Sequence, residues 1–285
     1  MFDIQYIRPQ SLDEAIDFLD QHGHQTEILA GGTDVLVDLK SDELHKKYLL
    51  DISRLETLQK IEIDDDQLTV GAGVTLTEIY DSEILACHAP AMQKCAFSFA
   101  SKQIRNVATI GGNVAHCSPC GDTVPPLVIH EAKAVLVSKN GEREVPVEQI
   151  ASGPYACALP SSEIISHFVL KPATEIDFAD FQKIGRRKEL SIARISMAAM
   201  ARQDEAGRLS FVRFCLGSCT PTPQRFQIVE DYLLGKAPTE SLLRDAGREL
   251  TDRMFEITGR RGSAIYKEPA IQGLFVRMLY PLCSQ

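Results

Sequence analysis

The 285-residue sequence lacks the features that membranes, export and nucleic acids require. No apolar run approaches the roughly 20 residues of a membrane-spanning helix, and we expect no membrane span. The opening MFDIQYIRPQ has neither a basic n-region nor an apolar h-region, so we predict no secretory signal. Acidic residues outnumber basic ones by 39 to 30, for a net charge of -9. This excess argues against a nucleic-acid partner, because phosphate contacts need a basic surface.

Two cofactor motifs are also absent. No G-x-G-x-x-G follows a predicted strand: Gly71-Ala72-Gly73 comes nearest but has Leu76 in the place of the third glycine, so a Rossmann site is not supported. The C-x4-C-x2-C spacing of plant-type ferredoxins is missing, so a [2Fe–2S] cluster held in that way is excluded. Eight cysteines are present, and without an export signal they predict a cytoplasmic protein whose thiols are mostly free.

The first 55 residues predict a small α/β unit. A helix is expected over 11–22, where Ser11 and Glu14 form a capping box and Gly23 ends the helix. TEILA then predicts a buried strand, VLVDLKS a helix and KYLLDIS a further strand. A glycine-rich turn separates the first of these strands from the helix, an order typical of α/β units.

Residues 56–175 show the alternating pattern of β-hairpins. KIEIDD with QLTVGAG predicts one hairpin, and AKAVLVSKNGEREVPV predicts another, turned by Asn140-Gly141. SSEIISHFVL predicts one more strand. Helices are expected over TLTEIYDSEIL, capped by Thr75 or Thr77, and over PAMQKCAFSFAS.

The remaining residues form a third region. FADFQKIGRR, ISMAAMARQ and RLSFVRFCLGSC predict strands, and helices are expected over 238–258 and 263–279. We therefore divide the chain into 1–55, 56–175 and 176–285.

The first chemical feature is the stretch Leu29-Ala30-Gly31-Gly32-Thr33-Asp34. A strand leads into two glycines, which can adopt positive φ and let a ligand approach backbone amides. Thr33 or Asp34 can cap the next helix, whose N-terminus favours an anion. The pattern fits a phosphate or pyrophosphate cradle, but this motif alone favours an ordinary β–α turn.

The second feature is Thr109-Ile110-Gly111-Gly112-Asn113, with Asp122 downstream. Here too, two glycines precede a polar side chain that can donate and accept hydrogen bonds. A diphosphate needs several amide donors converging from more than one direction, and two such turns about 80 residues apart in the sequence can supply them.

His116, Cys117 and Cys120 raise the alternative of a metal site. A closed zinc site needs four ligands, and the nearest second pair is Cys215 with Cys219. Four such thiols could hold an iron–sulfur cluster. Adjacent imidazole and thiol groups are poorly placed to converge on one metal in an extended segment, so we predict no metal and keep Cys117 and Cys120 only as cluster candidates.

Five motifs in order resemble the FAD-binding subunits of the molybdenum hydroxylases, the family of bacterial xanthine dehydrogenases and carbon-monoxide dehydrogenases. The resemblance runs from end to end. The matching stretches are Tyr6–Ala15 (F-x-Y-x-x-P-x-S-x-x-E-A), Leu29–Asp34 (L-A-G-G-T-D), Arg105–Asn113 with Ser118-Pro119 and Asp122 (R-N-x-A-T-I-G-G-N…A-S-P-x-x-D), Phe181–Arg187 (F-x-K-x-x-R-R) and Arg261–Lys267. Cys117 departs from this pattern, since the family has a small residue such as alanine there. One branch carries an extra cluster on an inserted loop that this chain lacks.

The resemblance implies an α+β fold, with a two-part FAD-binding domain of the vanillyl-alcohol-oxidase (PCMH) type followed by an α+β C-terminal domain. It implies that backbone of the two glycine stretches holds the diphosphate and ribityl chain of FAD, and that Asp122 and Lys183 lie at the flavin. Phe99 with Ala100 would lie near the ring or adenosine and Ile165 against FAD, although core packing also explains Phe99 and Ile165. The cofactor-binding residues implied are Leu29, Ala30, Gly31, Gly32, Thr33, Asp34, Phe99, Ala100, Thr109, Ile110, Gly111, Gly112, Asn113, Asp122, Ile165 and Lys183.

The resemblance also implies a function in a heteromeric complex. FAD would receive electrons from [2Fe–2S] clusters on a small subunit, after oxidation of the substrate at molybdopterin on a large subunit, and NAD⁺ would be the acceptor. No side chain is nominated as catalytic, because the flavin does the chemistry. Two alternatives stay open: a stand-alone FAD-dependent reductase of the same fold, and an interaction protein stabilised by zinc or an iron–sulfur cluster.

Overall fold

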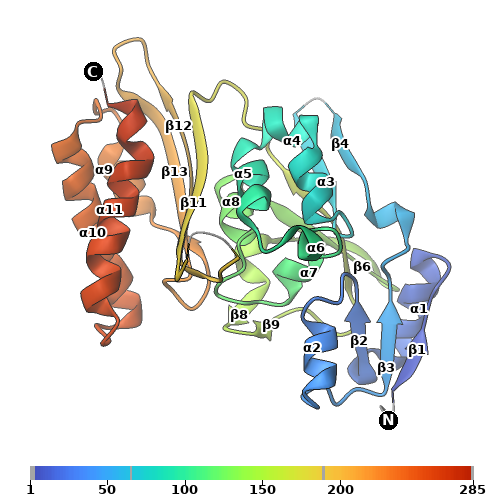
Figure 1. The fold of residues 1–285 in the computed structure, drawn as a ribbon. Helices are drawn as coiled ribbons and strands as arrows, with labels where there is room; N and C mark the ends of the chain where they lie inside the picture. The colour runs from blue at the N-terminus through green and yellow to red at the C-terminus, as the bar shows by residue number, and fades with distance from the viewer. Residues whose placement is uncertain (1–3, 65, 188–189, 284–285) are drawn as a thin grey trace.

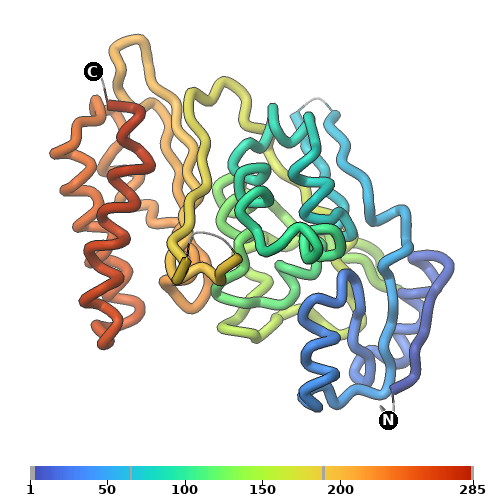
Figure 2. Tube along the Cα trace, viewed as in Figure 1, coloured from blue at the N-terminus to red at the C-terminus, as the bar shows by residue number. Residues whose placement is uncertain are grey.

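The computed structural model describes residues 4–64, 66–187 and 190–283. These residues form an α+β fold, as predicted, with three larger sheets that follow one another along the chain and one small hairpin (Figure 1). The N-terminal sheet and the C-terminal helices lie at opposite ends, with the central region between them (Figure 2).

The N-terminal sheet is parallel, with strand order β1-β3-β2. Its elements are β1 (Gln5–Ile7), α1 (Leu12–His22), the 3-10 turn η1 (Gly23–Gln25), β2 (Thr26–Leu29), α2 (Val35–Lys40) and β3 (Tyr48–Asp51). The predicted start of α1 is confirmed, but only half of the capping box forms. The Ser11 hydroxyl accepts from the Glu14 amide at 3.2 Å, whereas the Glu14 carboxylate accepts from the amide of Gln10.

The central sheet is antiparallel, with order β4-β5-β10-β6-β7. Its strands are β4 (Ile61–Asp64), β5 (Gln67–Gly71), β6 (Lys133–Ser138), β7 (Gly141–Pro146) and β10 (Ile164–Leu170). The helices of this region are α3 (Leu76–Asp81), α4 (Glu83–His88), α5 (Pro90–Ser98), α6 (Lys102–Arg105), α7 (Ile110–Ala115) and α8 (Val124–Ile129). One core joins sheet and helices, for example Phe168 on β10 with Met92 on α5. The short elements η2 (Glu56–Leu58), η3 (Val147–Gln149), β8 (Ala151–Gly153) and β9 (Ala156–Cys157) complete the region.

In this region, the turn and capping signals that act over no more than four residues are confirmed. Gly141 adopts φ +102 in the predicted hairpin turn between β6 and β7. Thr75 caps α3 through a complete capping box with Glu78. The single helix expected after Thr75 is wrong, because Ser82 has extended backbone and caps a separate helix, α4. The second glycine stretch is also not a simple turn, since it forms the first turn of α7 with Thr109 as its N-cap.

The C-terminal sheet has the order β11-β12-β13-β14. Its elements are β11 (Phe178–Gly185), β12 (Ala193–Gln203), β13 (Leu209–Gly217) and β14 (Gln224–Arg225), followed by α9 (Gln227–Leu233), α10 (Glu240–Thr258), α11 (Ala264–Leu279) and the turn η4 (Tyr280–Leu282). Strand β12 is buried on both faces: Ala198 and Met200 face the central core, while Met197 and Ala199 face the core formed with the helices. Among the described residues, no helix combines the length and apolar character needed to cross a bilayer.

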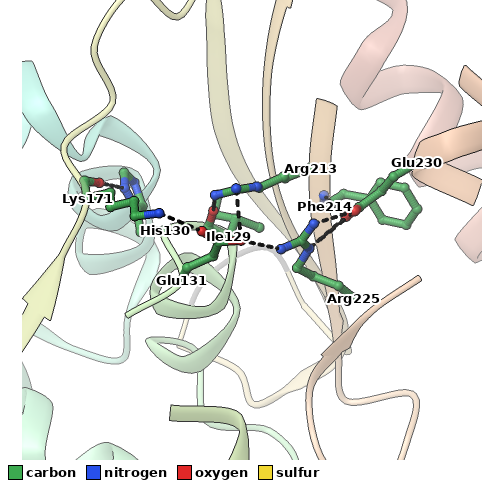
Figure 3. Close-up of polar contacts among 8 residues, drawn as sticks. All are labelled: Ile129, His130, Glu131, Lys171, Arg213, Phe214, Arg225 and Glu230. Carbon is green, nitrogen blue, oxygen red and sulfur yellow. Dashed lines mark hydrogen bonds and ion pairs between the residues drawn. The ribbon is translucent and has the colours of Figure 1, made fainter. Parts of the chain in front are cut away.

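An ion-pair cluster joins α8 to the C-terminal sheet (Figure 3). The Glu131 carboxylate lies 2.9 Å from Arg213 and 3.3 Å from Arg225, and Arg225 lies 2.7 Å from Glu230. Burial raises the pKa of Glu131, but the nearby cations, Arg213 foremost, outweigh it and hold the pKa below its ordinary value. The cluster therefore fixes the C-terminal sheet against the central region through charged groups as well as through the shared core.

Candidate functional site

A cleft of about 340 Å³ lies where the N-terminal sheet meets the central region. Its walls come from β2 and the turn that follows, from the start of α7, and from a segment that ends in β10. The residues implied by the resemblance that line it are Ala30, Gly31, Gly32, Thr33, Asp34, Phe99, Thr109, Gly111, Gly112, Asn113 and Ile165. The two glycine stretches, far apart in sequence, thus face one cavity.

The first glycine stretch leaves its backbone donors available. The amides from Gly31 to Val35 donate to no other residue among those described. Gly32 has φ +71, a conformation that glycine adopts without strain. A Cβ at Gly31 would lie 2.0 Å from the Val107 carbonyl oxygen, so only glycine permits this close approach. This row of unpaired donors, lining a cleft, is suited to an anion.

The second glycine stretch uses its donors within the protein. The Ile110 amide donates to Val74 at 3.0 Å, that of Gly111 to Ala72 at 2.9 Å, and that of Gly112 to the Thr109 hydroxyl at 3.1 Å. A Cβ at Gly111 would lie 2.6 Å from the Cβ of Ala72, so this glycine also serves close packing. The backbone amides of these three residues are therefore not available to a ligand without rearrangement.

Asn113 provides the polar group of the second stretch. Its side-chain oxygen accepts from the Thr123 amide at 3.2 Å and from the Thr123 hydroxyl at 2.7 Å. The amide nitrogen Nδ2 has no partner among the described residues, while Asn113 lines the cleft. One end of the side chain is thus fixed by the protein, and the other end remains a free donor.

Asp122 and Lys183 form a buried pair outside the cleft lining. Lys183 Nζ on β11 donates to Asp122 Oδ2 at 2.6 Å, and Asp122 Oδ1 is buried without a partner among the described residues. Burial raises the pKa of Asp122, and the Lys183 ammonium opposes this rise. An unsatisfied buried carboxylate oxygen is costly, so this oxygen would accept from a ligand donor once a rearrangement opened access to it.

The other implied residues lie around these groups. Ala100 has φ +34, and the carbonyls of Phe99 and Ala100 accept from Arg105 at 2.8 and 3.3 Å. Ile165 belongs to the central core and also lines the cleft. Leu29, Ala100, Ile110, Asp122 and Lys183 are not among the lining residues.

The cysteines considered as cluster ligands do not form a group of three among the described residues. Cys117 is buried with its thiol toward the carbonyls of Val114 and Ile150, and Cys215 is fully buried in the central core. Within the described part of the chain, no three side chains of His, Cys, Asp or Glu are grouped to hold a metal ion. The Cys117 carbonyl accepts from the amide of Tyr155, between the two strands of the small hairpin, at 2.8 Å.

The third wall of the cleft was missed from the sequence, apart from Ile165. It includes Cys157, Leu159 and Ser161, and Glu27 and Lys46 add charges on the side of the first sheet. Burial raises the pKa of Glu27. No motif marks Cys157, Leu159 and Ser161, because they reach the cleft through a strand of two residues, β9, and the loop beyond it.

Known proteins agree with this architecture. A family model described as the FAD binding domain in molybdopterin dehydrogenase matches residues 2–171, and one described as the CO dehydrogenase flavoprotein C-terminal domain matches residues 180–282. A xanthine dehydrogenase FAD-binding subunit from Escherichia coli O157:H7 is 36% identical, covering 86% of this chain and 87% of the relative. A nicotinate dehydrogenase FAD-subunit from Eubacterium barkeri is 28% identical, covering 100% and 98%.

A solved structure extends the agreement to the fold. A chain of carbon monoxide dehydrogenase from Hydrogenophaga pseudoflava superposes with a TM-score of 0.90 at 28% identity, covering 99% of this chain and 98% of that one. The expected fold class, a two-part PCMH-type domain followed by a C-terminal domain, is confirmed.

Proposed function

The chain belongs to the family of FAD-binding subunits of the molybdenum hydroxylases, and on that premise we propose that it passes electrons from [2Fe–2S] clusters of a partner subunit through FAD to NAD⁺. It is an oxidoreductase subunit of this dehydrogenase family. The observation that carries the proposal is the row of unpaired amides from Gly31 to Val35, which lines the cleft between the two glycine stretches.

The residues of the cleft fit a dinucleotide. The amides of Gly31 to Val35 would bind the diphosphate, and Gly32 leaves room because it has no side chain. Asn113 Nδ2 would donate to the ribityl chain or diphosphate from the opposite wall. Phe99 and Ile165 would supply apolar contact, as most cofactor sites do.

The buried Asp122–Lys183 pair would bind the polar edge of the flavin. Asp122 Oδ1 would accept a hydrogen bond there, while Lys183 keeps the other oxygen fixed. Bound FAD supplies the ability to take up electrons singly and to release them as a hydride. The side chains bind, orient and exclude water, and none is proposed as a general acid or base.

We propose the same division of the chain as before: 1–55 and 56–175 as the two FAD-binding subdomains, and 176–285 as the C-terminal flavoprotein domain. It is supported by the three sheets, which occupy separate stretches of sequence. The partners would be a molybdopterin-binding large subunit and a [2Fe–2S] small subunit in the cytoplasm.

Flavin binding is tested with the isolated chain. We expect FAD to co-purify or to be taken up in a stoichiometric amount, giving flavin absorbance that elutes with the protein. Absence of bound flavin from a folded chain would reject the proposal. Stoichiometric zinc or iron without flavin would favour an interaction protein instead.

The acceptor is tested with the native complex. Substrates named in the relatives, such as xanthine and nicotinate, are screened with NAD⁺ and with an artificial dye as alternative acceptors. Substrate-dependent NADH formation supports the proposed path, and reduction of the dye alone rejects NAD⁺. Steady NADPH consumption by the isolated chain with an enolpyruvyl sugar would favour a stand-alone reductase.

A further inference from the structure

Cys117 is tied to the β8–β9 hairpin, which contributes to the third wall of the cleft. The Cys117 carbonyl accepts from the Tyr155 amide at 2.8 Å, and its thiol lies 3.8 Å from the Ile150 carbonyl oxygen. Within the hairpin, Ala151 pairs with Cys157. Cys117 and Cys157 are therefore held by the same few residues, although they lie 40 positions apart in the sequence.

The two thiols differ in access. Cys117 is only 5% exposed, whereas Cys157 is exposed and lines the cleft. The Ile150 carbonyl oxygen that the Cys117 thiol contacts also accepts from the amide of Ala158, the residue after Cys157, at 2.8 Å. An exposed thiol beside a buried one is the arrangement in which the first reacts with an oxidant and the second resolves the product.

The chemistry of the pair is asymmetric in the same sense. The neighbouring Cys117 side chain lowers the pKa of Cys157 to about 6, and burial and Glu27 oppose this change only in part. The Cys157 side chain, followed by burial, raises the pKa of Cys117 well above its ordinary value. At neutral pH the exposed sulfur is thus the thiolate, which is the nucleophilic form.

We propose that Cys157 and Cys117 form an oxidation site that reduces hydroperoxides and closes a disulfide at the cleft. The Cys157 thiolate attacks one peroxide oxygen of H₂O₂, the O–O bond breaks, and sulfenic acid and hydroxide form. Cys117 then attacks the Cys157 sulfur, the S–O bond breaks, and the departing oxygen takes the Cys117 proton and leaves as water. The hydroxide from the first step takes up the proton that Cys157 lost on ionisation, so two thiols and one peroxide give one disulfide and two waters.

The disulfide would change the wall of the cleft. It would join the residue after His116 to the hairpin, and His116 Nε2 already lies 3.7 Å from Asp34 in the first glycine stretch. The ring of His116 also packs edge-on against Tyr155 at 5.3 Å. A covalent tie here would restrict movement between the first and third walls.

The test uses the full chain, reduced and then treated with hydrogen peroxide. Free thiols are alkylated, the protein is digested without reductant, and the peptides are analysed by mass spectrometry. We expect a linked peptide joining 117 to 157, which is absent in Cys157→Ser and Cys117→Ser. In Cys117→Ser, Cys157 should stop at sulfenic acid and be trapped by dimedone.

Matched controls make the result specific. Cys120→Ser removes the neighbouring thiol that falls in the same peptide and should leave the linkage intact, as should Cys87→Ser, which removes another exposed thiol. Failure of the wild type to form the linkage, or its loss in Cys120→Ser, would overturn the proposal. The readout does not depend on flavin, so a chain that binds no FAD and still forms the disulfide would reject the proposed function alone.

Discussion

The two Gly-Gly stretches that face the cleft have nearly the same sequence pattern and opposite hydrogen-bonding states. At Gly31-Gly32 the backbone amides have no partner among the described residues, whereas at Gly111-Gly112 the protein itself provides the acceptors. Unpaired donors persist only where water or a ligand can reach them, because burying them costs free energy. The first stretch is therefore suited to ligand binding, and the second to close packing against the central sheet.

Gly31 connects the two roles. Its missing Cβ lets the first stretch approach the Val107 carbonyl, two residues before Thr109. The packing of one stretch thus sets the position of the other, and stability and ligand affinity should respond differently to substitutions in each.

The largest effect is expected from Gly111→Ala. The new Cβ would lie 2.6 Å from Ala72 Cβ and 2.7 Å from the Ala72 carbonyl oxygen, and backbone must move to relieve this contact. We expect the free energy of unfolding to fall by about 3 kcal/mol, measured by denaturant titration.

Gly273→Ala is the matched control for this substitution. Gly273 lies within α11, and nothing lies within 4 Å of an added Cβ. Alanine there should stabilise the protein by about 0.5–1 kcal/mol, because it favours the helix. Equal destabilisation by both variants would contradict a specific packing role for Gly111.

Acid should destabilise the central region, where His130 lies, and should leave the first glycine stretch unchanged. His130 follows α8, donates from Nδ1 to the Lys171 carbonyl at 2.8 Å and is buried. Burial, as the main cause, lowers its pKa to about 4 from an ordinary value of 6.5. The folded state therefore favours neutral His130, and this contribution is complete above about pH 6.5 and lost as the pH falls toward 4.

We expect about 2 kcal/mol of this contribution to be lost between pH 7.5 and pH 5. The measurement is the unfolding free energy of wild type and His130→Asn across that range. The variant should show a shallower dependence on pH. Parallel curves would assign the acid sensitivity to other groups.

The ligand-binding role of the first glycine stretch is tested with Gly32→Ala. Gly32 has φ +71, and the nearest contact of a new Cβ is the flexible Leu36 side chain at 3.0 Å. The backbone should turn away from positive φ and carry the amides of this stretch with it. We expect about a tenfold loss of FAD affinity, equivalent to 1.4 kcal/mol, by fluorescence titration. A stability loss as large as that of Gly111→Ala, with unchanged FAD affinity, would show that Gly32 serves packing and not ligand binding.

The sequence predicts those features whose cause is local. Ser11, Thr75 and Asn140-Gly141 act within four residues, and each marks the element boundary that the structure has. The different hydrogen-bonding states of the two glycine stretches could not be predicted from such local signals. The acceptor for the Gly111 amide is Ala72, which lies 39 positions earlier and comes close only when the central sheet has formed.

The cleft shows the same limit. Motifs identify its first two walls, because each of them contains a glycine pair followed by a polar residue. Cys157 carries no such signal: it stands outside every motif, and only the hairpin brings it to Cys117. A nucleophilic thiol depends on its neighbours in space, which a single sequence does not contain.

The smallest and most local effect concerns that thiol. If the Cys117 side chain lowers the pKa of Cys157 to about 6, the rate of Cys157 alkylation should reach half its maximum near pH 6. An ordinary thiol reaches half its maximal alkylation rate at about pH 8.5. Cys117→Ala removes the thiol and should move the midpoint upward, while Cys117→Ser keeps a polar side chain and should move it less. A midpoint that is the same in all three proteins would show that the pKa of Cys157 does not depend on Cys117.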